Sequence, residues 1–370
     1  MIRCRVCGET NASQALFCRR CTAPVSVVPL HELGEAEHRE YLGALFEVLA
    51  EAERRADGTK RVVDDELWRA YLSAFWLRPE TALILYAEAL AIRATAGGLS
   101  GPWLDLGCGD GIHAGIYAGW RFHEQFDAFQ SLDLSAADLY DRYEPAEFSA
   151  CVVREGQPLE HGIDVKPTAV ARARALGVFG EVAQADATRL PLAEQSVGVI
   201  FSNMLRDLGE PLNAALAECR RVLRQDGTLL ISAMTPLYAS SLYFAPAARQ
   251  AEMRGDRDAA RQLLKLDRGR SVFCQRQLSV EQWEPLLAQA GLHVDGVTTI
   301  AGGSALRFWD IGLRPFSPAL LRQRDAWLKA GALGSIKWSI IEGMDRVLAP
   351  LVRTVTDGDA CMHLIVARSS

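Results

Sequence analysis

The sequence predicts an α/β protein built on a doubly wound, Rossmann-like β-sheet. Apolar segments of strand length alternate with amphipathic segments of helix length between residues 103 and 232, a pattern typical of a parallel sheet covered by helices on both faces. A glycine-rich loop follows the first of these strands, and acidic or polar residues end the next ones. Because ligands bind beyond the carboxyl ends of the strands in such sheets, we expect the functional site there.

A cysteine motif precedes the sheet. Two C-x-x-C pairs, separated by ten residues, lie within residues 1–28, and this is the spacing of a zinc ribbon in which each pair places two thiolates on one turn. We expect a structural zinc ion, with a rubredoxin-like iron site as the alternative. Two disulfides are disfavoured because the chain begins without a signal peptide, and we expect a cytoplasmic protein. The expected ligands are Cys4, Cys7, Cys18 and Cys21.

Residues 29–98 are predicted to be a helical segment. Apolar side chains recur at helical spacing over Tyr41–Leu49, Leu67–Trp76 and Pro79–Ala96. We interpret these stripes mainly as core, and as a wall of the substrate pocket in the alternative. Residues 99–370 then form the domain that contains the sheet.

The glycine loop is the most informative motif of this domain. A strand from Trp103 ends in the string D-L-G-C-G-D-G, which runs from Asp105 to Gly111. Glycine has no Cβ and tolerates positive φ, so a ligand can lie against bare backbone here. The spacing G-x-G-x-G differs from the G-x-G-x-x-G that seats a dinucleotide pyrophosphate. It resembles the first motif of class I S-adenosylmethionine-dependent methyltransferases.

The segments after the loop agree with this resemblance. They are expected in the order strand, helix, strand, strand, helix, turn and strand. Their ranges are His161–Pro167 with Asp164 at the strand end, Ala169–Leu176, Glu181–Ala187, Val197–Asn203, Pro211–Leu223, Gln225–Gly227 and Thr228–Ser232.

The resemblance implies a seven-stranded sheet whose last strand is antiparallel, and S-adenosylmethionine as cofactor. The glycines would cradle its methionine portion, with Asp105 near the ammonium group. The second strand end would bind the ribose, the third the adenine, and the fourth would line the methyl-donor end. The implied cofactor residues are Asp105, Gly107, Gly109, Gly111, Asp164, Val165, Asp186, Ala187, Ser202 and Asn203.

Two insertions depart from the family pattern. Asp164 follows Asp105 by 59 positions, where the resemblance implies about 20, so a segment near 119–160 is inserted. It contains a competing second strand, Phe129–Ser135, with Asp133 as the ribose acid. We prefer Asp164 because a helix and the next strand follow it directly. A second insertion near 304–359 separates the last two expected strands, His293–Ile300 and Cys361–Ala367.

The region between the fifth strand and these last two is predicted to be helical. Arg249–Arg270 is interpreted as a helical lid, and Ser279 as the N-cap of a helix over Glu281–Ala290 that ends at Gly291. The uncharged stretch Gly227–Ala248 contains a proline and several hydroxyl side chains, so we expect no membrane span.

A sulfonium methyl group is already a reactive electrophile, so the protein mainly has to hold donor and acceptor in line. A general base is needed only for an acceptor of high pKa. His113, just beyond the glycine loop, is the first candidate, and Asp207 after the fourth strand is the second. His161 ranks lower because it precedes a strand.

Three functions are compatible with these motifs. The first is methyl transfer to a small-molecule or glycan- or lipid-linked acceptor, with the ribbon as a stability module or a contact for a protein partner. The second is an RNA methyltransferase that uses the ribbon, which carries four arginines. The net charge of −6 and the absence of an Asn-Pro-Pro-type motif after the fourth strand disfavour it. The third is a non-catalytic cofactor-binding scaffold.

Overall fold

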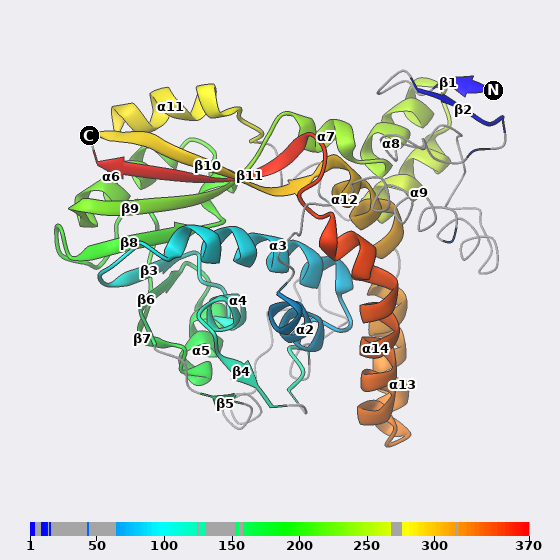
Figure 1. Cartoon of the computed structure of the whole chain (residues 1–370), viewed down its shortest axis with the longest axis horizontal. Coiled ribbons are helices and arrows are strands. Elements are labelled where there is room, and N and C mark those ends of the chain that lie inside the picture. The colour runs from blue at the N-terminus through cyan, green and yellow to red at the C-terminus, as the bar shows by residue number, and fades with distance from the viewer. Residues whose placement is uncertain are drawn as a thin grey trace.

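A seven-stranded mixed sheet lies at the centre of the part of the chain that the computed structural model describes (Figure 1). The described residues are 1–3, 9–13, 15, 43, 64–123, 126–129, 152–154, 158–267, 276–314 and 317–369.

The strand order of this sheet is β7-β6-β3-β8-β9-β11-β10. The first five strands in this order pair in parallel, whereas β11 is antiparallel to both β9 and β10. The expected seven strands and the expected antiparallel last strand are therefore confirmed. Their bounds are β3 Trp103–Leu106, β6 Leu159–Asp164, β7 Phe179–Gln184, β8 Val197–Ser202, β9 Leu223–Met234, β10 Leu292–Gly302 and β11 Ala360–Ser369.

Helices cover both faces of the sheet because side chains along each strand alternate between two cores. Val199 and Phe201 of β8 join the core formed with α2 to α5, whereas Ile200 between them joins the core under α6 and α11. All three side chains are buried. The helices are α2 Asp65–Ala74, α3 Pro79–Ala96, α4 Ile112–Tyr117, α5 Pro167–Leu176, α6 Leu212–Val222 and α11 Val280–Gln289.

Local signals fix several helix ends where the sequence predicts them. Pro167 begins α5, and Gly177 ends it with a φ of 74°. Ser279 and Gln282 form a reciprocal capping box at the start of α11, and Gly291, with a φ of 75°, follows its end.

Three predicted boundaries are wrong. The turn at Gln225–Gly227 lies inside β9, because Val197 pairs with Leu223 and Val199 with Thr228, so the extra residues bulge out of a continuous strand. The third strand spans Phe179–Gln184, and Asp186 therefore follows it rather than ending it. The segment interpreted as one helical lid instead contains two helices, α8 Phe244–Met253 and α9 Arg257–Asp267, which are preceded by α7 Leu237–Ser241.

Both expected insertions contain elements outside the main sheet. In the first, β4 Arg121–Phe122 pairs antiparallel with β5 Val152–Arg154, and Asp133 lies outside the described residues. The second is helical, with α12 Gly303–Phe308, the π-helical turn η4 Trp309–Leu313, α13 Ser317–Lys329 and α14 Leu333–Arg353.

At the N-terminus, β1 Ile2–Arg3 pairs with β2 Thr10–Asn11. Cys4, Cys7, Cys18 and Cys21 lie outside the described residues, as does the expected helix over Tyr41–Leu49 apart from Gly43. Among the described helices, none is both long and apolar enough to cross a membrane.

Candidate active site

The glycine loop connects β3 to α4 and has left-handed backbone at Gly107, Gly109 and Gly111, with φ values of 85°, 55° and 80°. Only one of the three faces open space. A Cβ built on Gly109 meets no atom within 4 Å, whereas one on Gly107 would lie 2.3 Å from Met204 Cγ and one on Gly111 3.1 Å from a ring carbon of Phe179. A ligand can therefore approach bare backbone at Gly109.

Asp164, at the end of β6, lies at this loop. Its Oδ2 accepts a hydrogen bond of 2.9 Å from the Gly109 amide, and its Oδ1 accepts one of 2.9 Å from Lys166. The amides of Gly107 and Cys108 both donate to the Ile163 carbonyl, so the loop is also bonded to the β6 backbone. The structure thus brings the predicted ribose acid to the glycine loop, with Val165, which is 57% exposed, beside it.

Asp186 lies two residues beyond the end of β7 and is exposed. Its Oδ1 accepts hydrogen bonds from the amide and the hydroxyl of Thr188 at 2.8 and 2.7 Å, and these bonds lower the pKa of its carboxyl. The Ala185 amide donates to the Asp164 carbonyl, so both acids lie at the same edge of the sheet. Ala187, the other residue expected at the adenine, is buried.

The residues after β8 turn inward. Ser202 is fully buried, and its hydroxyl donates to the Leu106 carbonyl at 2.8 Å and accepts from the amides of Met204 and Leu205. Ser202 therefore holds the β8 turn against β3. Asn203 donates from Nδ2 to Glu88 Oε2 at 3.2 Å.

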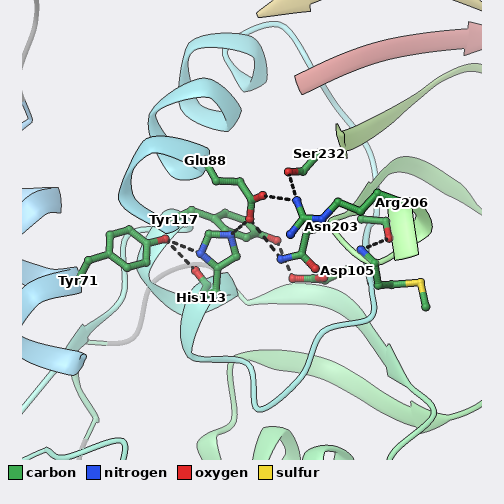
Figure 2. A network of polar contacts seen from close by, with 10 residues as sticks. Tyr71, Glu88, Asp105, His113, Tyr117, Asn203, Arg206 and Ser232 are labelled. Carbon is green, nitrogen blue, oxygen red and sulfur yellow. Dashed lines mark hydrogen bonds and ion pairs between the residues drawn. The ribbon is translucent and has the colours of Figure 1, made fainter. Parts of the chain in front are cut away.

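Glu88 of α3 is the centre of a buried polar network that joins five segments of the chain (Figure 2). Its carboxylate lies 3.0 Å from His113 Nε2 and 3.6 Å from Arg206 Nη1. His113 Nδ1 lies 2.8 Å from the hydroxyl of Tyr71 in α2. Arg206 donates from Nη1 to Ser232 Oγ of β9 at 2.6 Å. Helices α2 and α3, the start of α4, the turn after β8 and strand β9 are thereby held together.

The two acids of this region have opposite protonation behaviour. Burial opposes the charge of Glu88, but the hydrogen bond and charge of His113, together with the charge of Arg206, lower its pKa to about 2. Burial raises the pKa of Asp105 to about 7, although Tyr117 donates a hydrogen bond of 3.1 Å to its carboxylate. Glu88 is therefore a permanent anion near neutral pH, whereas Asp105 titrates there.

The two predicted general bases differ in their surroundings. Both ring nitrogens of His113 already face a partner, Tyr71 or Glu88, and its side chain is 12% exposed. Asp207 belongs to the short helix η3, Leu205–Asp207, and its side chain is 44% exposed. His161 lies in β6 with its Nδ1 3.6 Å from a carboxylate oxygen of Glu181, away from the glycine loop.

Sequence reasoning missed Glu88 and Arg206. Glu88 lies in the run L-Y-A-E-A-L of α3, and an acid within such an apolar helical run was the available signal, because buried carboxylates require partners. No sequence motif marks Arg206 as part of a site. Among the residues that the structure describes, no group of three or more His, Cys, Asp or Glu side chains could hold a metal ion.

Comparison with known proteins gives one family and one curated relative. Residues 145–231 match the family model of a methyltransferase domain, a segment that includes Asp164, Asp186 and Ser202. A malonyl-(acyl-carrier protein) O-methyltransferase of Methylococcus capsulatus (strain Bath) is 33% identical over 129 residues, which is 35% of this chain and 36% of the relative. The chain thus matches about a third of the length of this relative.

Solved structures resemble the chain at low identity. A SAM-dependent methyltransferase from Mesorhizobium loti has 18% identity and a TM-score of 0.36, with coverage of 76% of this chain and 97% of that one. One from Thermotoga maritima, described as a possible histamine N-methyltransferase, has 15% identity and a TM-score of 0.35, with coverage of 58% and 72%. At these TM-scores neither structure indicates what this chain acts on.

Proposed function

We propose that this chain transfers the methyl group of S-adenosylmethionine to a small-molecule or glycan- or lipid-linked acceptor. The main support is the hydrogen bond from the Gly109 amide to Asp164. Of the three loop glycines, Gly109 is the one with open space at its Cβ position. The methyltransferase family match over the adjoining strands supports the same function.

The residues around this loop fit the cofactor. The Gly109 backbone, the carboxylate of Asp164 with Val165 beside it, and Asp186 with Ala187 would hold its methionine, ribose and adenine portions. When bound, the cofactor supplies a sulfonium methyl group that reacts directly with a nucleophile. The protein then has to orient the acceptor and exclude water, which is achieved by positioning rather than by covalent catalysis.

Of the two candidate bases, only Asp207 is proposed to accept a proton. With both ring nitrogens engaged, His113 acts as a positioning residue that connects Tyr71 to Glu88. Asp207, whose carboxylate is half-exposed, is the group that would accept a proton from an acceptor of high pKa.

A small acceptor is favoured over nucleic acid. The net charge of −6 opposes the phosphate contacts on which nucleic-acid affinity depends. The curated relative is named as an O-methyltransferase of malonyl-(acyl-carrier protein) and not of a nucleic acid. We further propose that residues 1–28 form a structural zinc ribbon that stabilises the chain or contacts a protein partner.

Calorimetry with S-adenosylhomocysteine, the product form of the cofactor, tests this function. We expect the full chain to bind it. Gly109→Ala should lose at least tenfold in affinity because the new Cβ enters the open space, and Asp164→Asn should lose a similar factor. Asp258→Asn, on the exposed face of α9, is the matched control and should bind like the wild type. No binding by the wild type would contradict the proposal.

Labelled S-adenosylmethionine and fractionated cell extract then identify the acceptor. Label in the small-molecule or acyl fraction is expected. Label that disappears on ribonuclease treatment would assign the chain to RNA instead. Cofactor binding without any transfer would indicate a scaffold.

A further inference from the structure

A cavity of about 210 Å³ lies beside Arg206, beyond the carboxyl ends of β8 and β9. Most of its lining residues belong to α3, α7, α12 and η4 or directly flank these helices. Half of its twelve lining residues form an apolar part of the wall beside its charged groups: Ile84, Leu85, Met234, Leu306, Trp309 and Met362.

Arg206 lines this cavity and has one hydrogen-bond donor without a partner among the described residues. Its side chain is 12% exposed, and its Nη1 is held by Ser232 and faces Glu88. Its Nε is buried and has no hydrogen-bond partner among the described residues. The nearest acid on its own turn, Asp207, has Oδ2 3.9 Å from that Nε, which is beyond hydrogen-bond range. A buried donor without a partner is costly, so a ligand acceptor at this position would be favourable.

The other charged groups of the wall are paired with each other or with groups behind it. Arg78 Nε lies 3.3 Å from Glu80 Oε1, and Glu80 also accepts from the Ser317 hydroxyl. Arg314 bonds Asp310 at 2.8 Å and the Asp267 carbonyl. Glu88, the partner of Arg206, is shared with His113 and Asn203. Among the described cations of this wall, Arg206 is therefore the one with a buried donor that has no hydrogen-bond partner.

A guanidinium binds a carboxylate best, because Nε–H and one Nη–H match its two oxygens. The cavity is smaller than the 300–1,000 Å³ typical of sites for drug-sized ligands, which favours a short acyl or aryl chain. We propose that this cavity binds a small apolar carboxylic acid, with its carboxylate on Arg206, and that this acid is or carries the methyl acceptor. The acceptor role rests on the proposed function, whereas the carboxylate site can be tested alone.

Hexanoate and its uncharged amide, hexanamide, are the probes. Calorimetry on the full chain, with and without saturating S-adenosylhomocysteine, should show hexanoate binding at least tenfold more tightly than hexanamide. Arg206→Gln should remove this preference. Arg206→Lys keeps the charge beside Glu88 but not the two-pronged geometry, and should retain part of it. Arg261→Gln, whose side chain is 71% exposed on α9, should behave like the wild type.

Three results would overturn the carboxylate site: equal binding of the two probes, no binding of either, or a preference that survives in a folded Arg206→Gln. The wild-type comparison needs no variant, so misfolding of Arg206→Gln would leave the test intact. Failure of S-adenosylhomocysteine to bind, with the hexanoate preference intact, would remove the proposed function and leave the carboxylate site standing.

Discussion

A carboxylate in the interior of a protein is stable only when charged or hydrogen-bonding partners replace the water that it loses. Glu88 has three partners from two separate segments: His113 of α4, and Asn203 and Arg206 of the turn after β8. Two of them lie on either side of the proposed site, since His113 follows the glycine loop and Arg206 borders the cavity. Glu88 therefore links the helix that follows the glycine loop to the residue that lines the cavity.

Removing the charge of Glu88 should destabilise the fold, because the buried Arg206 then loses its counter-ion. We expect Glu88→Gln to lower the free energy of unfolding by about 2–4 kcal/mol. Glu342→Gln, which removes an exposed carboxylate 3.9 Å from Arg346 in α14, should cost less than about 1 kcal/mol. Urea denaturation of both variants measures the difference, and equal losses would show that the buried network does not stabilise the fold.

The raised pKa of Asp105 predicts that its contribution to folding stability falls as pH rises, whereas that of a typical acidic residue increases. Its pKa is about 7 in the folded chain, compared with 3.8 for a free aspartate side chain. Between these values the folded chain holds a proton that the unfolded chain releases, so the contribution of Asp105 to stability falls as pH rises through that window.

Asp105→Asn does not titrate and can still accept a hydrogen bond from Tyr117. Its stability relative to wild type should therefore increase by roughly 2–3 kcal/mol between pH 5 and pH 8. Urea unfolding at both pH values measures this increase, and a pH-independent difference between variant and wild type would contradict the argument.

Single residues were predictable where one local rule determines their place. Asp164 ends a parallel strand next to the glycine-loop strand, so the sheet edge brings it to the loop. The hydroxyl of Ser202 was expected to line the methyl-donor end, and its three bonds to backbone depend on tertiary contacts that no spacing reveals. Glu88 and Arg206 were missed for the same reason, since their partners lie 25 or more positions away in the chain.

At the scale of elements, helices with caps and prolines were predictable to within a residue or two. Helix α3 spans Pro79–Ala96 as expected, and α11 begins directly after its Ser279 cap. Strand β9 was not predicted correctly, because Asp226 and Gly227 carry a turn signature while pairing with β8 and β11 imposes a bulged strand. Pairing between strands is non-local, so it overrides turn propensity without leaving a signal in the local sequence.

At Gly198, near the start of β8, the backbone of residues 100 and 101 lies so close that there is no room for a side chain. A Cβ there would lie 2.4 Å from the Ser100 carbonyl oxygen and 2.9 Å from Gly101 Cα, both backbone atoms that cannot rotate away. We expect Gly198→Ala to lower the free energy of unfolding by about 2–3 kcal/mol. Gly97→Ala places its Cβ where no atom lies within 4 Å and keeps a helical φ of −60°, so it should be neutral or slightly stabilising. Equal effects in urea denaturation would show that the β8 backbone has room to move.

At the scale of the whole molecule, the two sides of the proposed site come from segments with different sequence signals. The cofactor side, from β3 to β8, carries the glycine loop and the strand-end acids, and these were visible in the sequence. The cavity side combines α3 with α12 and η4, which belong to the second insertion. That insertion was predicted only as a departure from the family pattern. The sequence alone therefore gave no indication of the chemistry of the acceptor.

The zinc ribbon is a prediction about the full chain. The pairing of Ile2–Arg3 with Thr10–Asn11 closes a short hairpin, and Cys4 and Cys7 lie between these strands in the sequence. A segment of about thirty residues cannot bury enough core to fold alone, so metal binding would supply its folding free energy.

We expect elemental analysis of the purified chain to find about one zinc per chain. The double variant Cys4→Ser/Cys7→Ser should lack it, whereas Cys219→Ser, a buried cysteine of α6, should retain it. The affinity for S-adenosylhomocysteine should stay within about twofold in all three proteins, because the residues proposed to bind it begin at the glycine loop. Iron in place of zinc would select the rubredoxin-like alternative, and the absence of both metals would reject a metal site at these cysteines.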